Sequence, residues 1–318
     1  MVKKKILITG GSGYIGSRLS LYFANKDYAV TTICHSKIPS NEHWVSKMER
    51  VVLADIRDEE CMTKLAQEKF DVLIHLVSLD HYQSNQAPTF VSSINIAPVW
   101  SLLDTFSKNG LSQFIYFSTA QVYGALSKEH VIENQILQPL NTYGFTHQVG
   151  ELICDYYNRT SNICCNVVRL SNSYGSPLFE ENNCWDLVIN DLCKMAFFKK
   201  EIVLKSDGSP KRDFIHGWDV CHAVEKIIEK KNSKGIYNLS SGNTLTILEI
   251  AQKIQSVYQE RYHLKIDISA ATTNNSSNTG KYVIDNSLIK SIGFLPLWDI
   301  EMGINELFDY FENKTRNE

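Results

Sequence analysis

Short apolar runs, many of them β-branched, recur along the first half of the chain, and segments with helical spacing separate them. These runs cover residues 6–8, 29–33, 51–54, 72–77, 114–118 and 166–170. Runs this apolar, alternating with helices, are typical of strands buried on both faces of a parallel sheet. Right-handed crossovers place the helices on both sides of such a sheet. The pattern predicts an α/β fold of the Rossmann type, with a doubly wound parallel sheet.

The texture of the sequence changes after Leu170. The stretch 171–211 is rich in polar and turn residues, and 272–280 is almost wholly polar. We therefore expect residues 1–170 to form the main domain and 171–318 a smaller, mixed lobe over the carboxyl ends of its strands, where open α/β sheets bind ligands. The apolar run 236–239 resembles one more sheet strand, so 213–241 is expected to return to the main domain.

The first apolar run ends in a glycine cluster that opens an amphipathic helical segment, 14–23. Gly11, Gly13 and Gly16 satisfy the pattern G-x-G-x-x-G between a strand and a helix. Glycine is needed there because the turn uses backbone angles that a Cβ forbids, and because a pyrophosphate must approach the amides at the helix N-terminus. The motif in this setting predicts a dinucleotide site.

The amino-acid composition argues against several classes of function. Of 318 residues, 43% are hydrophobic and 21% charged, and the formal net charge is −3. This balance gives no reason to expect nucleic acid or an anionic membrane as partner, and no apolar stretch reaches the roughly 18 residues of a membrane span. Eight cysteines without C-x-x-C spacing indicate neither a metal site nor a disulfide framework. Reduced thiols in the cytoplasm are the expectation.

Further polar segments fall where strands are expected to end. They are 55–58, 75–78, 118–124 and 143–147, with Glu151 beyond. Together with the glycine cluster, this order resembles the extended short-chain dehydrogenase/reductase family, and within it the nucleotide-sugar epimerases, dehydratases and 4-keto reductases. The segments 169–175, 211–216 and 237–242 agree with it, so the resemblance spans essentially the whole chain.

The resemblance, together with the end of the second strand, assigns a cofactor site and a substrate site. The cofactor site comprises Gly10, Gly13, Tyr14, Ile15, Gly16, His35, Ser36, Lys37, Asp55, Ile56, Leu76, Val77, Ser78, Tyr143 and His147. The substrate site comprises Asp80, Thr119, Ala120, Gln121, Asn172 and Arg212. Asn172 and Arg212 are implied to meet the substrate diphosphate, since a guanidinium offers charge and bidentate geometry.

The implied catalytic residues are Thr119, Tyr143 and His147. Thr119 is to hydrogen-bond the reacting sugar oxygen, and Tyr143 is to exchange a proton with it while the cofactor carries the hydride. Relatives have Tyr-x-x-x-Lys, whereas this chain has histidine at 147. One helical turn keeps both side chains on one face, but an imidazole near neutrality carries at most a partial charge. Tyr143 should therefore be a poorer base here than in those relatives.

Two other departures narrow the reaction and the cofactor. The sugar 4,6-dehydratases carry an Asp-Glu pair where this chain has Ala120 and Gln121, so elimination lacks its acid and base. The second strand ends in residues 34–37 without the acidic residue that binds the adenosine ribose in NAD users. Ser36 and Lys37 are able to contact a 2′-phosphate instead, which tilts the choice toward NADP while NAD stays open.

The sequence thus predicts an NAD(P)-dependent oxidoreductase that acts at C4 of a nucleotide-diphosphate sugar, as a 4-epimerase or a 4-keto reductase. Two alternatives remain open: a C4 dehydrogenase, and a non-catalytic nucleotide-binding protein that keeps the fold without the lysine. By the same resemblance, the helix after Asn95 and the helix containing Tyr143 are expected to pair with their copies in a homodimer. In the second helix, the apolar positions at helical spacing are Phe145, Val149, Leu152, Ile153 and Tyr156.

Overall fold

A computed structural model describes residues 3–126, 129–182, 184–230, 232–271 and 282–317. The polar stretch 272–280 thus lies outside the described residues. The chain divides into two compact units. The first comprises 1–125, 133–170 and 223–238, and the second 126–132, 171–222 and 239–318. The segment that returns to the first unit is thus 223–238 rather than 213–241, and the second unit also takes 126–132.

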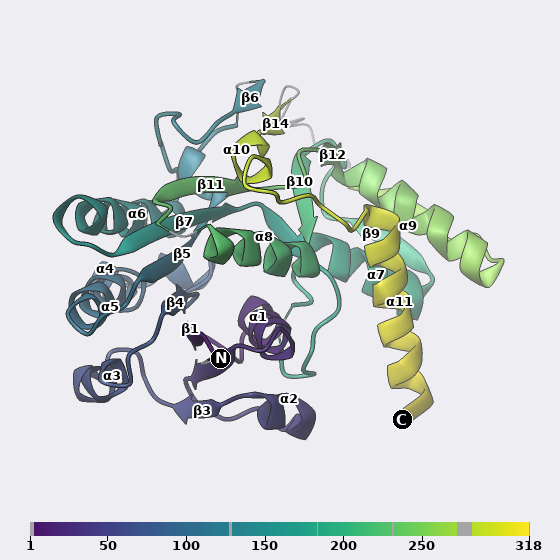
Figure 1. The fold of residues 1–318 in the computed structure, drawn as a ribbon. Coiled ribbons are helices and arrows are strands. Elements are labelled where there is room, and N and C mark those ends of the chain that lie inside the picture. The colour runs from purple at the N-terminus through teal and green to yellow at the C-terminus, as the bar shows by residue number, and fades with distance from the viewer. Residues whose placement is uncertain (1–2, 127–128, 183, 231, 272–281, 318) are drawn as a thin grey trace. The chain divides into compact units, whose positions relative to one another are not determined.

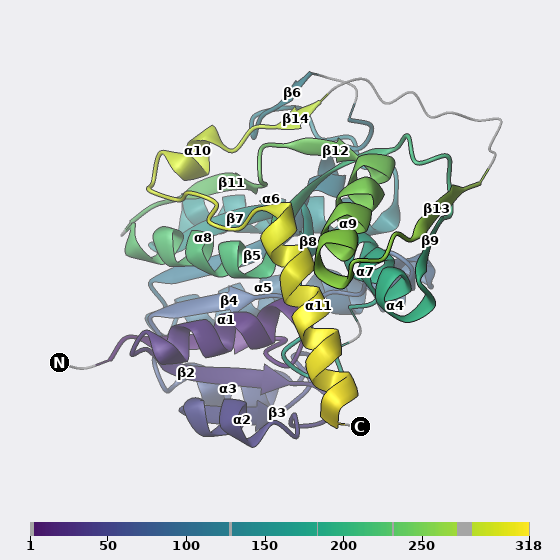
Figure 2. The ribbon, with the colours of Figure 1, turned by 90° about the vertical axis from the view of Figure 1, so that its right-hand side faces the viewer.

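The first unit is built on a seven-stranded sheet, counted over the described residues, in the order β3-β2-β1-β4-β5-β7-β11. Every neighbouring pair from β3 to β7 is parallel, and the strands lie one above another in Figure 2. Helices α3, α5 and α6 lie on one side of the sheet, and α1 and α2 on the other (Figure 1). The predicted doubly wound fold is confirmed.

Each expected apolar run forms a strand of this sheet. The elements of the first unit are β1 (Lys5–Thr9), α1 (Tyr14–Asn25), β2 (Ala29–Cys34), α2 (Glu42–Lys47), β3 (Arg50–Leu53), α3 (Glu59–Ala66), β4 (Val72–His75), η1 (Gln83–Asn85), α4 (Pro88–Asn95), α5 (Ala97–Ser107), β5 (Gln113–Thr119), η2 (Ala120–Tyr123), α6 (Thr142–Thr160), β7 (Cys164–Leu170) and β11 (Gly235–Leu239). Burial on both faces explains the runs: all seven residues of β5 and the first six of β7 are buried.

The second unit packs three helices, α7, α9 and α11, around an apolar core of its own. Its elements are β6 (His130–Val131), β8 (Asn172–Tyr174), α7 (Val188–Lys199), β9 (Glu201–Leu204), β10 (Lys211–His216), β12 (Thr244–Thr246), α9 (Ile247–Tyr262), β13 (Asp267–Ala270), β14 (Val283–Ile284), α10 (Ser287–Lys290) and α11 (Ile300–Asn317). Helix α8 (Gly217–Glu229) begins in this unit and ends in the first. The described part of 171–211, expected to be loop-rich, thus holds a helix of 12 residues and the strands β8 and β9, and β10 begins at its last residue.

Candidate functional site: a dinucleotide cradle beside a tyrosine–threonine pair

The loop between β1 and α1 is closed by glycines at points where a side chain would collide. A Cβ on Gly16 would lie 2.0 Å from the carbonyl oxygen of Gly10, and a Cβ on Gly11 would lie 2.5 Å from Cβ of Thr32. Gly10 has φ +72°, a conformation that favours glycine. The Gly13 amide donates to the Gly10 carbonyl at 3.0 Å. The strand, the loop and the helix therefore pack too closely to admit side chains at Gly11 and Gly16.

The first turn of α1, which includes Tyr14 and Ile15, is suited to an anion. Its N-cap is Gly13, and no acidic residue lies in the turn. The first amides of a helix have no acceptor within it, and the helix dipole favours negative charge there. Within 4 Å, a Cβ on Gly13 would meet only the Gly10 carbonyl oxygen, at 3.2 Å. The space above this turn is open, and the cradle fits the pyrophosphate of a dinucleotide.

The end of β4 lies directly beside this loop. Oγ1 of Thr9 is 2.8 Å from Nδ1 of His75 and accepts the Leu76 amide at 3.3 Å. A Cβ on Gly10 would lie 3.3 Å from Cγ2 of Val77. Burial lowers the pKa of His75 to about 3, so this histidine is a neutral core residue. These contacts place Leu76 and Val77 beside the glycine loop.

The ends of β2 and β3 carry the residues expected around the adenosine. His35, Ser36 and Lys37 are exposed after β2. Nε2 of His35 lies 3.5 Å from Oδ2 of Asp55, and the same oxygen accepts NH2 of Arg57 at 2.6 Å. The Arg57 guanidinium lowers the pKa of Asp55 to about 2, so Asp55 is a paired anion. The side chain of Ile56 is buried in the hydrophobic core.

Thr119 and Tyr143 meet where β5 ends and α6 begins. Thr119 is the last residue of β5, and its Oγ1 accepts the Gln121 amide at 3.2 Å. Tyr143 is the second residue of α6, whose N-cap Asn141 donates through Nδ2 to Oε1 of Gln121 at 2.8 Å. The hydroxyls of Thr119 and Ser78 lie close enough to the Tyr143 phenol to lower its pKa. Ser78 follows β4, the strand that borders the cradle, so the predicted reactive pair lies near that strand.

The phenol of Tyr143 is strongly held in its protonated form. Burial raises the pKa of Tyr143 to about 12; the Asp80 carboxylate also raises it, while the hydroxyls of Thr119 and Ser78 oppose the rise. Oδ1 of Asp80 is fixed by the amides of Tyr82 and Gln83 at 2.8 and 2.7 Å. At neutral pH the site therefore presents a proton rather than a base.

His147 lies one turn further along α6 and is only 2% exposed. Its Nδ1 is 2.7 Å from the carbonyl oxygen of Tyr143, and the two rings are 4.3 Å apart. Burial lowers the pKa of His147 to about 4, so the ring is neutral. Because a carbonyl oxygen only accepts, Nδ1 carries the proton and Nε2 the lone pair. The position thus offers one acceptor where the related motif offers a charged donor.

A buried polar network ties these elements together. Oε1 of Glu151 accepts Oγ of Ser118 at 2.5 Å, and Arg169 from β7 donates to both oxygens of Glu151, at 2.6 Å in the shortest bond. NH1 of Arg169 also donates to the Tyr123 hydroxyl at 2.9 Å, which donates to Oδ1 of Asn238 at 2.5 Å. Ser118 precedes Thr119, and Glu151 lies on α6, so the network fixes the strand and the helix that carry the reactive residues.

Asn172 and Arg212 belong to the second unit and lie on neighbouring strands, β8 and β10. Nδ2 of Asn172 donates to the Asp213 carbonyl at 2.8 Å, and NH1 of Arg212 to the Lys211 carbonyl at 2.7 Å. The Tyr282 hydroxyl also donates to the Lys211 carbonyl, at 2.9 Å, and Arg212 opposes the rise that burial causes in the pKa of Tyr282. Asn172 is paired with Phe214, two residues after Arg212, and both predicted substrate residues are exposed.

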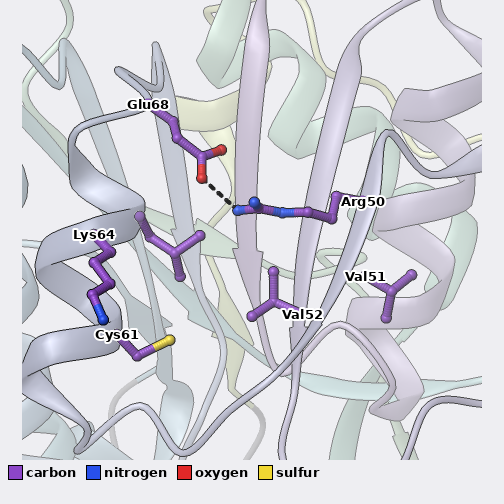
Figure 3. Close-up of a pocket in the computed structure, with 7 residues that line it drawn as sticks. Arg50, Val51, Val52, Cys61, Lys64 and Glu68 are labelled. Atoms are coloured by element: carbon purple, nitrogen blue, oxygen red, sulfur yellow. Dashed lines mark hydrogen bonds and ion pairs between the residues drawn. The ribbon is translucent and has the colours of Figure 1, made fainter.

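A pocket of about 340 Å³ lies elsewhere in the first unit, between β3 and α3. Figure 3 shows Val52, Cys61 and Lys64 around it, and the Arg50–Glu68 pair, 2.7 Å long, beside it. None of the predicted site residues lines this pocket. Over the described residues, no His, Cys, Asp and Glu cluster is arranged to hold a metal ion, and no helix is long and apolar enough to cross a membrane.

Sequence reasoning missed the contacts that several residues of this site make. Arg57 follows Asp55 by two positions, a spacing that signals a local ion pair only once the turn is known. Arg169 stands inside an apolar strand, where a buried arginine needs a partner, and Glu151 is that partner. Asp80 was expected to meet substrate, and the structure places its charge close enough to act on Tyr143.

The fold and the glycine cradle define a dinucleotide-binding α/β protein. The chain belongs to the NAD dependent epimerase/dehydratase family, whose sequence model matches residues 6–240. The family consists of NAD-dependent enzymes that catalyse epimerisation or dehydration, and this chain is one of its members.

The chain is similar to several known proteins over nearly its full length. The chain is 27% identical to the low-salt glycan biosynthesis protein Agl12 of Haloferax volcanii, covering 96% of this chain and 98% of that protein. It is 26% identical to a putative UDP-glucose 4-epimerase of Methanocaldococcus jannaschii, covering 98% and 99%. The crystal structure of the Thermotoga maritima UDP-glucose 4-epimerase has a TM-score of 0.85 at 22% identity, over 98% and 99% of the chains. This last likeness is one of fold.

Proposed function

We propose that this protein is an NAD(P)-dependent oxidoreductase acting at C4 of a nucleotide-diphosphate sugar, by 4-epimerisation or by reduction of a 4-ketosugar. The observation that carries the proposal is that Thr119, the last residue of β5, lies close enough to the Tyr143 phenol to lower its pKa. Strand β4 separates β5 from β1 and borders the glycine cradle. Ala120 and Gln121 stand where elimination requires carboxylates, which argues against dehydration.

The chain's residues have distinct tasks in this reaction. A bound nicotinamide supplies or removes the hydride at C4. Thr119 hydrogen-bonds O4, and Tyr143 transfers the proton at the same oxygen. Nε2 of His147 accepts a ribose hydroxyl and so orients the cofactor. The amides of the first turn of α1 hold the pyrophosphate. Glu151 and Arg169 keep Thr119 and Tyr143 in register.

The nucleotide part of the substrate is assigned to the second unit. Arg212 is a fixed cation with bidentate geometry for phosphate, and Asn172 adds an amide donor. Support for NADP comes from the end of β2, where His35, Ser36 and Lys37 are exposed and the neighbouring Asp55 carboxylate is paired with Arg57. Binding titrations with NAD and NADP side by side test this preference.

We assign the partner to a second copy of this chain. On α5 and α6, Trp100, Phe145, Leu152 and Tyr156 are about half exposed or more. Phe145, Leu152 and Tyr156 are spaced by seven and four residues, which places them on one helical face. Such an apolar face is covered in a homodimer; Ile153 packs inward instead. Free thiols at all eight cysteines support a cytoplasmic location.

The decisive experiment is isotope exchange at C4. The purified protein is incubated with cofactor labelled at the nicotinamide C4 and with a panel of nucleotide-diphosphate sugars and their 4-keto forms. Label in the C4 position of a 4-ketosugar, or interconversion of C4 epimers without net label, is expected, and either activity should be lost in Tyr143→Phe. Net oxidation with accumulating reduced cofactor identifies a C4 dehydrogenase. Binding of nucleotide with neither exchange nor C4 epimerisation on any sugar identifies a non-catalytic protein and overturns the proposal.

A further inference from the structure

One buried carboxylate, that of Asp213 on β10, holds three segments of the second unit together. Its Oδ1 accepts Oγ of Ser171 at 2.7 Å and the amide of Ser241 at 2.9 Å. Its Oδ2 accepts Oγ of Ser241 at 2.9 Å and the amide of Asn243 at 3.1 Å. Asp213 is fully buried, and a buried carboxylate is costly unless its oxygens are hydrogen-bonded. These four neutral donors therefore make the buried position tolerable, and in return the carboxylate ties their segments together.

The two predicted substrate residues flank this carboxylate and lie on the other face of the strands. Strands β8 and β10 are parallel, with Asn172 opposite Phe214. Successive side chains of a strand point to opposite faces, so Arg212 shares a face with Phe214 and hence with Asn172. Ser171 and Asp213 meet on the opposite face. Exposure agrees with this arrangement, because Asn172 and Arg212 are exposed and Asp213 is buried.

The hydrogen bond between Ser171 and Asp213 fixes the register of these two strands. β8 has three residues, so few ladder bonds specify its register. A slip of one residue moves every side chain of a strand to the other face, which would separate Asn172 from Arg212. The backbone carbonyl of Asp213 adds a second tie, since it accepts Nδ2 of Asn172 at 2.8 Å. One residue thus sets the positions of both predicted phosphate donors.

Two donors held on one face suit two linked phosphates better than one. Neighbouring strands lie about 4.8 Å apart and two residues advance about 6.6 Å along a strand, so the Cα atoms of Asn172 and Arg212 are roughly 8 Å apart. Across this gap, the guanidinium of Arg212 can bind one phosphate bidentately while the amide of Asn172 reaches the next. A monophosphate engages one of these donors and gains little from the other.

Resting on the proposed function, we infer that Asp213 is a positioning residue of the substrate site: it pins β8 to β10 so that Asn172 and Arg212 bind one diphosphate together, and so makes the site prefer a nucleoside diphosphate to the monophosphate. The Asp213 carboxylate lies on the buried face and acts through the two exposed donors. Its loss should weaken diphosphate binding and leave the dinucleotide cradle, which belongs to the first unit, unchanged.

The first test compares nucleotide affinities in Asp213→Asn. This variant keeps the shape of the side chain but removes its charge and turns one acceptor into a donor. The wild type, saturated with NAD, is titrated calorimetrically with UDP, GDP, CDP, ADP and dTDP, and the diphosphate that it binds is compared with the monophosphate of the same base. Asp213→Asn should bind this diphosphate about 10- to 100-fold more weakly, the monophosphate within about threefold of the wild type, and NAD equally well.

Asp219 supplies a matched control, because it is also a fully buried carboxylate of the second unit. It accepts the amides of Leu297 and Trp298 at 2.8 and 3.1 Å. Asp219→Asn should lower the thermal unfolding temperature without changing the ratio of diphosphate to monophosphate affinity. Ser171→Ala removes a single hydrogen bond to Asp213 and should lower that ratio by about 2- to 10-fold; it replaces Asp213→Asn if the latter does not fold.

The second test establishes whether Asp213 acts through Arg212. Diphosphate affinities of Arg212→Gln, Asp213→Asn and the double variant form a double-mutant cycle. Positioning predicts that the loss in the double variant is smaller than the product of the two single losses by about threefold or more. Losses that multiply, or an unchanged affinity ratio in folded Asp213→Asn or Ser171→Ala, overturn the inference and leave the proposed function intact. A wild type that binds none of the five diphosphates overturns both.

Discussion

Replacing His147 with lysine places a permanent cation beside Tyr143 and so tests the electrostatic reasoning directly. The ring centres of Tyr143 and His147 are 4.3 Å apart. An ammonium and a phenolate about 4 to 6 Å apart, at an effective dielectric constant of about 20, attract by about 3 to 4 kcal/mol. This corresponds to a fall of about 2 to 3 in the pKa of Tyr143. Burial also disfavours the ammonium, which takes back part of the effect, so we expect a fall of about 1 to 3.

The expected direction of the change in the pKa of Tyr143 determines what the assay should measure. A cation stabilises phenolate, so the pKa of Tyr143 moves down from about 12, and the phenolate present at pH 8 rises by about tenfold or more. His147→Lys should therefore speed C4 oxidation relative to ketone reduction and move the basic-side dependence of oxidation to lower pH. Tyrosinate absorbance and single-turnover hydride transfer across pH measure both quantities.

The matched control puts the same charge elsewhere on α6. Gln148→Lys adds an ammonium at the neighbouring position, which points about 100° away around the helix, and should leave the titration of Tyr143 unchanged. His147→Gln keeps a neutral hydrogen-bonding side chain and should also leave the pKa of Tyr143 high. Thermal unfolding of each variant establishes that the fold is retained. An unshifted Tyr143 titration in a folded His147→Lys protein would refute the reasoning.

Other consequences of the structure can be measured separately. Tyr143→Phe should lower the C4 exchange rate by roughly two to four orders of magnitude with cofactor affinity retained. Gly13→Val should abolish dinucleotide binding in a calorimetric titration, with the circular dichroism spectrum unchanged, because the side chain fills the space above the first turn of α1. Arg169→Met leaves Glu151 buried without its partner and should cost about 3–5 kcal/mol in urea unfolding, whereas adding Glu151→Leu should recover most of it. Leu152→Glu should convert a dimer to a monomer in sedimentation; a wild type that is monomeric at micromolar concentration contradicts the assigned partner.

The sheet and the cradle were predictable because their signals are local. Strands buried on both faces must be apolar throughout, and a glycine loop that meets neighbouring backbone tolerates no Cβ. Both constraints act on consecutive residues. The strands found at Ala29–Cys34, Cys164–Leu170 and Gly235–Leu239 follow the apolar runs closely for this reason.

The rest depended on contacts that sequence spacing does not reveal. Helix α7 lies in a stretch for which the sequence predicts loops, because polar residues on its outer side interrupt the buried positions, Ile189, Leu192 and Ala196 among them. The neutral state of His147 arises from burial and from one backbone carbonyl, and the high pKa of Tyr143 from burial and from Asp80 in a distant segment. Such shifts follow from the assembled surroundings of a group rather than from its type.

The Tyr123–Asn238 hydrogen bond has a consequence for how the protein is made. β11 is the edge strand beside β7, yet it is synthesised about seventy residues later. A growing chain that ends after β7 leaves that strand as an open edge able to pair with other chains. Tyr123, to which Arg169 donates, then has no Asn238 to hydrogen-bond. The first unit therefore becomes complete only when the intervening part of the second has already emerged. Until β11 has been synthesised, the N-terminal strands of the first unit therefore form an incomplete sheet.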